Sequence, residues 1–384
     1  MSVRFRVLVC FLSFLGFYSL VSSRRNRLVA AVSSSSSRCS RPQLFMTHST
    51  PSSTGLYLER MVERKKMEVN QLLRRHDKPD DPIFMRMTYM ASENKYNVTR
   101  SVPPTINASI FTSCNEYQTS FTACMYARAL KSVASSVNED EDNAPHRMTV
   151  MVDVKRRSPT VPSARNVVEF SKADKFAELL TLSGADSFLI NTDEFEYGGC
   201  DSDLRECVAS TKLAKPEFPP ANIVKDIIIH PVQIAKALEQ GASGVLLIVA
   251  VVGSDLEVLL DACTIMGTEA VVEVHTPNEL EFALSRGATI FLVNMWDRAS
   301  GEHFPDQAKG LANMMPMNSV SIAAGNILTL DQALELGYYG YDSVVLGRGI
   351  THVPDIKGFI DGVHNFRGAP RGITASMKGM PFGM

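Results

Sequence analysis

Ionisable and amide side chains recur at the ends of short apolar runs in this sequence, where they could serve acid–base chemistry. They are Asp153, Lys155, Lys225, Glu273 and Asn294. A lysine ammonium group can donate a proton or stabilise charge that develops on an oxygen, and a carboxylate can remove a proton. Two lysines and a glutamate facing one pocket could divide this work. The alternative is a set of salt bridges that only closes one end of a sheet.

The surroundings of the two lysines decide how acidic they are. Burial and a second positive charge both lower the pKa of a lysine, whereas a neighbouring carboxylate raises it. Asp153 and Lys155 are two residues apart, so they share one face of a strand and could interact in this way.

No metal site and no organic cofactor are expected. The seven cysteines are odd in number and no two are spaced as C-x-x-C, which argues against a disulfide framework or a zinc site. His230 and His275 are too far apart for a local ligand pair, and His275 is expected to be a hydrogen-bonded structural residue. The formal net charge of −2 gives no sign of a nucleic-acid binder.

From Met148 onward, short β-branched runs alternate with amphipathic segments of helical length. The expected strands are residues 149–154, 187–190, 222–224, 244–249, 270–274, 290–293, 320–323 and 343–346. The expected helices include residues 167–182, 231–240, 255–266, 278–286, 330–336 and 355–366. Continuous apolar strands separated by helices indicate a parallel sheet that is buried on both faces.

Eight such units within residues 148–366 predict a (β/α)8 TIM barrel, whose catalytic groups lie at the carboxyl ends of the strands. The competing fold is an open doubly wound sheet, which usually carries a glycine-rich turn after its first strand. Residues 155–159, Lys-Arg-Arg-Ser-Pro, form no such turn.

The remaining regions flank the barrel. Residues 56–147 are expected to form an N-terminal helical extension and linker, with helices at 56–76 and 117–137 and a charged loop at 138–143. Residues 77–107 show no clear periodicity. Residues 367–384, rich in Gly, Met and Pro, are expected to be a disordered tail.

Residues 1–55 have the composition of a targeting leader. Arg4 and Arg6 precede an apolar run at 7–21, too short for a membrane span and typical of a signal peptide. A stretch rich in Ser and Arg and without acidic residues follows, as in transit peptides. The two parts together predict a plastid protein with no membrane association in its mature form. The secretory pathway and the mitochondrion are the alternatives.

Several of these motifs resemble those of the indole-3-glycerol phosphate synthase family. Residues 153–160, Asp-Val-Lys-Arg-Arg-Ser-Pro-Thr, resemble its first-strand signature Glu-x-Lys-x-x-Ser-Pro-Ser, and Lys225-Asp226 resembles its Lys-Asp-Phe segment. Residues 272–275, Val-Glu-Val-His, are similar to its fifth strand, and Asn294 matches the asparagine that closes its sixth. Residues 58–69 resemble its N-terminal helix.

The resemblance implies a carbon–carbon lyase of tryptophan synthesis that uses no cofactor and acts on a small phosphorylated substrate. Lys225 would be the general acid and Glu273 the base, with Lys155 assisting and holding the substrate carboxylate. Asp153 and Asn294 would orient these groups. The phosphate would be bound by Ser158 and by the loops after the last two strands, at Gly325, Gly347, Arg348 and Gly349. Other tryptophan-pathway enzymes are candidate partners.

The sequence departs from the family pattern at four places. Asp153 replaces a glutamate, Trp296 stands where an arginine is usual, residues 323–325 read Ala-Ala-Gly for Glu-Ser-Gly, and Arg348 replaces an acidic or small residue. Arg348 could grip phosphate and offset the lost serine. Three functions therefore remain open: a synthase with a variant pocket, a related phosphosugar barrel with a changed substrate, and a non-catalytic binding protein.

Overall fold

The computed structural model describes residues 55–93, 148–158, 170, 172–298, 300–351 and 353–368. The predicted leader, the predicted helix at 117–137, the charged loop at 138–143 and the tail from residue 369 lie outside the described residues.

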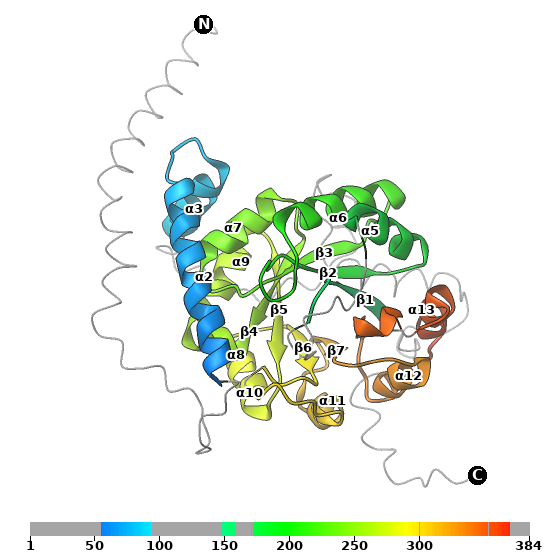
Figure 1. Cartoon of the computed structure of the whole chain (residues 1–384). Helices are drawn as coiled ribbons and strands as arrows, with labels where there is room; N and C mark the ends of the chain where they lie inside the picture. The colour runs from blue at the N-terminus through cyan, green and yellow to red at the C-terminus, as the bar shows by residue number, and fades with distance from the viewer. Residues whose placement is uncertain are drawn as a thin grey trace, which may run out of the picture. The chain divides into compact units, whose positions relative to one another are not determined.

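Eight parallel strands close into a barrel, each paired with the next and the last with the first (Figure 1). They are β1 Thr149–Val154, β2 Ser187–Asn191, β3 Ala221–Lys225, β4 Gly244–Ile248, β5 Glu269–Val274, β6 Ile290–Asn294, β7 Val320–Ala324 and β8 Ser343–Leu346. The predicted TIM barrel is therefore confirmed, and each strand lies within two residues of its predicted bounds.

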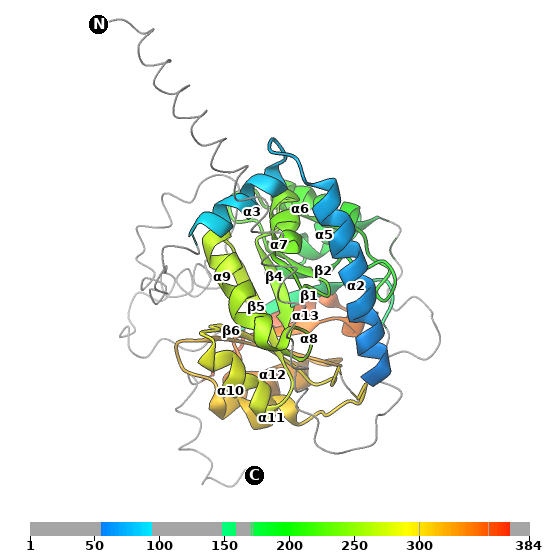
Figure 2. The same ribbon diagram turned by 90° about the vertical axis from the view of Figure 1, so that its left-hand side faces the viewer.

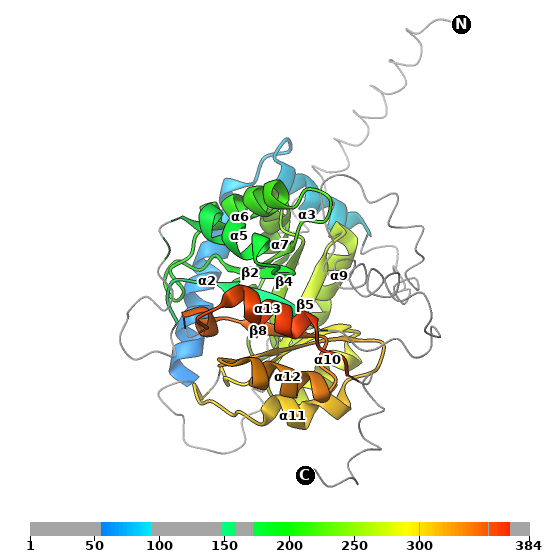
Figure 3. The ribbon, with the colours of Figure 1, turned by 90° about the vertical axis from the view of Figure 1, so that its right-hand side faces the viewer.

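Helices surround this barrel, and Figure 3 shows three of them, α11, α12 and α13, on one flank. The barrel helices are α5 Ala173–Leu182, α6 Asp201–Ala214, α7 Pro231–Glu239, α8 Val249–Val252, α9 Leu256–Met266, α10 Pro277–Ser285, α11 Gln307–Leu311, α12 Leu330–Tyr338 and α13 Ile356–His364. Several predicted bounds differ from the observed ones. Val249 begins α8 and does not extend β4, and Lys172 is extended, so α5 begins at Ala173.

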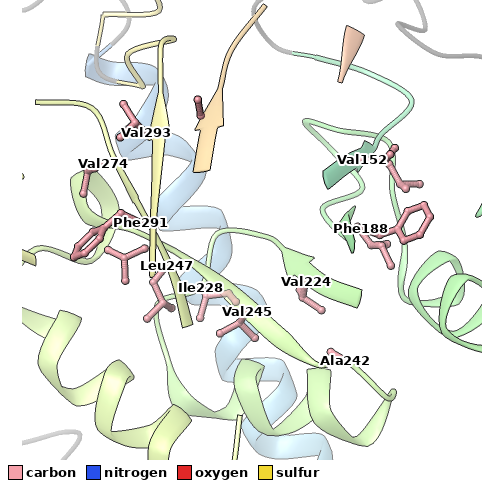
Figure 4. Close-up of a cluster of buried hydrophobic side chains, with 14 of the residues drawn as sticks. Val152, Phe188, Val224, Ile228, Ala242, Val245, Leu247, Val274, Phe291 and Val293 are labelled. Carbon is pink, nitrogen blue, oxygen red and sulfur yellow. The ribbon is translucent and has the colours of Figure 1, made fainter. Parts of the chain in front are cut away.

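Strand alternation divides the core into two layers. Outward-facing side chains pack beneath the helices, as the labelled residues of Figure 4 illustrate. Inward-facing apolar side chains fill the barrel: Met151, Leu189, Ile223, Leu246, Val271, Leu292, Ile322 and Val345. A buried parallel sheet of this kind explains why the strands read as continuous apolar runs.

The next inward position on each strand forms the top layer at the carboxyl end. These positions are Asp153, Asn191, Lys225, Ile248, Glu273, Asn294, Ala324 and Gly347. The period of two that buries the apolar layer therefore also brings five polar side chains to one mouth of the barrel.

Two helices from the N-terminal extension pack on the barrel beside α7 and α9 (Figure 2). Helix α2, Gly55–Arg75, confirms the predicted helix at 56–76, and its Met61 joins the apolar cluster of the barrel interior. Helix α3, Pro82–Glu93, was not predicted. The Asp81 carboxylate accepts from the backbone N–H groups of Ile83 and Phe84 at 2.9 Å and 3.2 Å and so caps α3. Within the described residues, no helix is long and apolar enough to cross a membrane.

Candidate active site

Asp153 organises one half of the barrel mouth. Its Oδ2 lies 2.5 Å from Nζ of Lys155 and 3.2 Å from Nζ of Lys225, and Asn191 donates to its Oδ1 at 2.8 Å. Burial alone would raise the pKa of Asp153, but the charges of Lys155 and Lys225 outweigh it and hold that pKa well below its usual range. An ionised carboxylate thus keeps two ammonium groups side by side in a buried position.

The ammonium group of Lys155 has a lowered pKa. Burial is the largest cause, and the nearby charge of Lys225 adds to it, while Asp153 opposes both. These opposing effects on the pKa are the ones expected for two lysines that share a carboxylate. A lysine with a lowered pKa gives up its proton more readily than a free lysine does, which suits acid–base chemistry.

Glu273 organises the opposite half of the mouth. Arg298 donates to both of its oxygens, from Nε to Oε1 at 2.6 Å and from the guanidinium to Oε2 at 2.9 Å. Asn294 donates to Oε1 at 3.1 Å. Burial alone would raise the pKa of Glu273, but the adjacent Arg298 and, more weakly, Lys225 lower it. Glu273 is therefore ionised at neutral pH and fixed in orientation.

Tyr197, on the loop between β2 and α6, joins the two halves. Its hydroxyl accepts a hydrogen bond from Arg298, and its ring centroid lies 5.8 Å from Nζ of Lys225 and 5.9 Å from Cζ of Arg298. Burial raises the pKa of Tyr197, so the hydroxyl stays protonated at neutral pH. The aromatic ring thus lies within cation–π distance of both cations.

The charges of the mouth favour an anion. Three cations, Lys155, Lys225 and Arg298, face two carboxylates, Asp153 and Glu273, which leaves a net charge of 3 − 2 = +1. A positive site with low-dielectric walls attracts anionic ligands. In the part of the chain that the structure describes, no three His, Cys, Asp or Glu side chains are placed to hold a metal ion.

The predicted phosphate-binding residues lie around the ends of β1, β7 and β8. A side chain at Gly325 (φ 114°) would strike Met295, since its Cβ would lie 2.9 Å from Cβ of Met295. At Gly349 a Cβ would lie 2.4 Å from the carbonyl oxygen of Ile327. Glycine is therefore needed at both positions for close backbone packing. Their phosphate contacts remain a prediction.

The other predicted phosphate-binding positions have different surroundings. Gly347 lies next to the half of the mouth that Asp153 organises, because a Cβ there would lie 3.4 Å from Oδ2 of Asp153. Ser158 is half-buried, four residues beyond the end of β1. Arg348 begins a short 3-10 helix after β8 and stacks on Trp296, with its Cζ 5.0 Å from the centroid of the indole.

Three site residues were missed by the sequence analysis: Asn191, Tyr197 and Arg298. Asn191 is the last residue of β2 and could have been found by extending the strand one residue, as for Asn294. Arg298 lies two residues after Trp296, so the mouth still receives a guanidinium although position 296 has none. Tyr197 comes from a loop, where no periodicity marks an inward residue.

The interpretation of the seventh strand needs a correction. Ala323 and Ala324 stand where the family pattern has two polar side chains, but the strand does not present both positions to the barrel interior. Ala323 packs in the outer cluster beneath the helices, and only Ala324 faces the barrel interior. His275 behaves as expected, since its Nδ1 lies 2.7 Å from the backbone oxygen of Asn294.

Known proteins resemble this chain over its barrel. The family model described as indole-3-glycerol phosphate synthase matches residues 112–363. The indole-3-glycerol phosphate synthase of Opitutus terrae is 32% identical over 209 residues, which are 54% of this chain and 77% of that protein. The Mycobacterium avium protein of the same name is 31% identical over 207 residues, 54% of this chain and 72% of its own. Among solved structures, 3-hexulose-6-phosphate synthase from Salmonella typhimurium has a TM-score of 0.43 at 15% identity, over 57% of this chain and 98% of that chain.

Proposed function

The chain belongs to the indole-3-glycerol phosphate synthase family, and from this premise we propose that it closes the indole ring of a phosphorylated substrate. The substrate would be 1-(2-carboxyphenylamino)-1-deoxyribulose 5-phosphate. The ring carbon that bears the carboxylate attacks the ketone carbon and forms a carbon–carbon bond. The carboxylate leaves as carbon dioxide, the former ketone oxygen leaves as water, and indole-3-glycerol phosphate remains.

Lys225 is the proposed general acid of the ring closure. Negative charge develops on the ketone oxygen as the carbon–carbon bond forms, and an ammonium group can stabilise this charge and protonate the oxygen. Lys155 would hold the substrate carboxylate until it leaves as carbon dioxide. The position of both ammonium groups on Asp153 supports this division, because one carboxylate orients both cations toward the same mouth.

Glu273 is the proposed base of the second half of the reaction. Loss of the hydroxyl as water requires removal of a proton from the intermediate, and an ionised carboxylate can accept it. The hydrogen bond from Asn294 fixes the carboxylate, and the lowered pKa of Glu273 keeps it ionised at neutral pH. The convergence of Lys155, Lys225 and Glu273 on one mouth is the observation that carries the proposal.

The substrate phosphate is proposed to bind beside the ends of β1, β7 and β8. Backbone N–H groups can approach closely at glycine, and a guanidinium pairs with phosphate through two parallel hydrogen bonds. This end of a TIM barrel commonly holds phosphate. The residues proposed for it are Ser158, Gly325, Gly347, Arg348 and Gly349.

The test is turnover by the full chain, followed by the fluorescence of the indole product. We expect Lys225→Ala and Glu273→Gln each to lower the rate by about 10² to 10⁴, the usual contribution of a general acid or base. Lys66→Met, which removes an exposed lysine of α2, is the matched control and should leave the rate unchanged. Tight substrate binding without turnover would indicate a non-catalytic protein, and the absence of binding would indicate a different substrate.

A further inference from the structure

Trp296 and Arg348 are in contact across the carboxyl end of β7. Trp296 lies two residues beyond β6 and Arg348 two residues beyond β8, while β7 stands between these strands in the barrel. The Cζ of Arg348 is nevertheless 5.0 Å from the indole centroid, which is the distance of a cation–π contact. Two residues that depart from the family pattern at separate strands therefore form one unit.

The end of β7, which stands between these two strands, carries only small residues. Ala324 is the inward residue there, and Gly325 follows with a left-handed backbone and no space for a Cβ beside Met295. Neither position carries a side chain longer than a methyl group, where the family pattern has a serine and a glycine. Trp296, Ala324 and Arg348, three departures from the family pattern, therefore lie at the ends of three neighbouring strands.

The indole is held firmly against the rest of the site. The backbone N–H of Trp296 donates to the side-chain oxygen of Asn294 at 3.0 Å, and Trp296 forms an antiparallel bridge with His303. The two rings lie 4.9 Å apart between centroids. The Cζ of Arg348 lies over the indole ring, so the ring meets the guanidinium with its face. A ring fixed in this way restricts the orientation of the guanidinium stacked on it.

We propose that Trp296 is a positioning residue that holds the guanidinium of Arg348 for the substrate phosphate. The inference rests on the proposed function for the identity of the phosphorylated ligand. In this chain the side chain of Arg348, which follows β8, would bind the phosphate in place of the serine that is absent from the end of β7. A planar guanidinium suits this task, because it stacks on an aromatic ring and still presents its donors to phosphate oxygens. Burial lowers the pKa of Arg348, but an arginine remains charged at neutral pH.

The chain contains one tryptophan, so emission excited beyond the absorption of its ten tyrosines reports on the surroundings of Trp296. We expect inorganic phosphate, titrated into the full chain, to change the emission of Trp296 in a saturable way. Arg348→Met keeps the apolar stem without the charge and should abolish this change, with phosphate affinity about 10- to 100-fold weaker. Arg286→Met removes a surface arginine that pairs with Glu257, and as the matched control it should leave the titration unaltered.

Substitutions of Trp296 distinguish a positioning role of the indole from a purely structural role. Trp296→Leu should raise KM by about 2- to 30-fold, the range of a cation–π contact, with little change in kcat. Trp296→Phe keeps an aromatic face and should recover most of the loss. Since Trp296 acts through Arg348, the double variant Trp296→Leu/Arg348→Met should bind phosphate no more weakly than Arg348→Met alone.

The inference and the proposed function fail in different ways. If calorimetry gives equal phosphate affinities for the parent chain, Trp296→Leu and Arg348→Met, the positioning role is overturned. This holds even if the chain turns over its substrate. Phosphate binding that depends on both residues in a chain without turnover would overturn the proposed reaction alone. If Trp296→Leu does not fold, the fluorescence titration of Arg348→Met still decides whether the guanidinium binds phosphate.

Discussion

Arg298 and Glu273 are joined by two parallel hydrogen bonds, at 2.6 Å to Oε1 and 2.9 Å to Oε2. Fork-like pairing of a guanidinium with a carboxylate is strong and fixes the carboxylate plane. Only 3% of the Glu273 side chain and 16% of the Arg298 side chain are exposed, so solvent screens the pair little. Arg298 therefore controls both the orientation and the basicity of the proposed base.

Replacement of Arg298 by glutamine should shift the acid limb of the pH–rate profile to higher pH. The Glu273 carboxyl would stay buried without its cation, and burial alone raises its pKa. A base with a raised pKa is protonated, and so inactive, at a pH where the parent chain is still active. The measurement is kcat/KM across the acid range. An acid limb that stays in place would show that Glu273 is not the base, or that Arg298 does not set its pKa.

The stability of the chain should fall steeply in acid because of Asp153 and Glu273. The pKa of each is lower in the folded chain than in the unfolded chain. Each carboxylate therefore stabilises the fold above its unfolded pKa of about 4, and this stabilisation is lost as pH falls through the folded pKa. Urea unfolding at a series of pH values from neutral downward measures the effect. Glu273→Gln should show a shallower decline, and an equal decline in that variant would contradict the assignment.

Asp153→Glu should destabilise the chain although glutamate is the usual family residue at this position. Asp153 is 3% exposed, and its Oδ2 is already 2.5 Å from Lys155, so one more methylene must displace its neighbours. Overpacking of a buried site costs about 1–3 kcal/mol. Denaturant unfolding of Asp153→Glu measures this cost. An unchanged free energy of unfolding would show that the mouth adapts freely to the longer acid.

The sequence was sufficient to predict most of the top layer, and the reason is the period of the strands. Asp153, Lys225, Glu273 and Asn294 each end an apolar run on its inward face, so alternation alone places them together. Resemblance to a family then supplied their proposed roles. Alternation could not supply Tyr197 or Arg298, because loop conformation positions them and it depends on contacts distant in sequence.

Contacts between elements that are distant in sequence could not be predicted from the sequence pattern either. Nothing in the sequence indicated that Arg348 would reach Trp296 across β7, since the contact depends on which strands are neighbours in the closed barrel. The helical pattern of α2 was clear, but it did not indicate which of its charged residues would be buried. One of them, Lys65, is only 3% exposed.

Lys65 connects helix α2 to two loops at the barrel mouth through ion pairs. Its Nζ lies 3.0 Å from Oδ2 of Asp193 and 2.8 Å from Oδ1 of Asp226. Asp226 directly follows Lys225, and the backbone N–H of Glu196, the neighbour of Tyr197, donates to Asp193 at 2.7 Å. Burial alone would raise the pKa of Asp193, but the charge of Lys65 keeps it below its usual range. One ammonium group thus holds two carboxylates that are close in sequence to Lys225 and Tyr197.

Lys65→Met should therefore lower both stability and turnover. Removing one partner of a buried ion pair costs about 3–5 kcal/mol, because the remaining charge is left uncompensated. The loss should be largest at neutral pH and smaller in acid, where Asp193 becomes protonated. Lys66→Met changes the next residue of α2, which is 55% exposed and paired only on the surface, and should alter stability by about 0.5 kcal/mol or less. Equal unfolding free energies for the two variants would show that α2 is not anchored through Lys65.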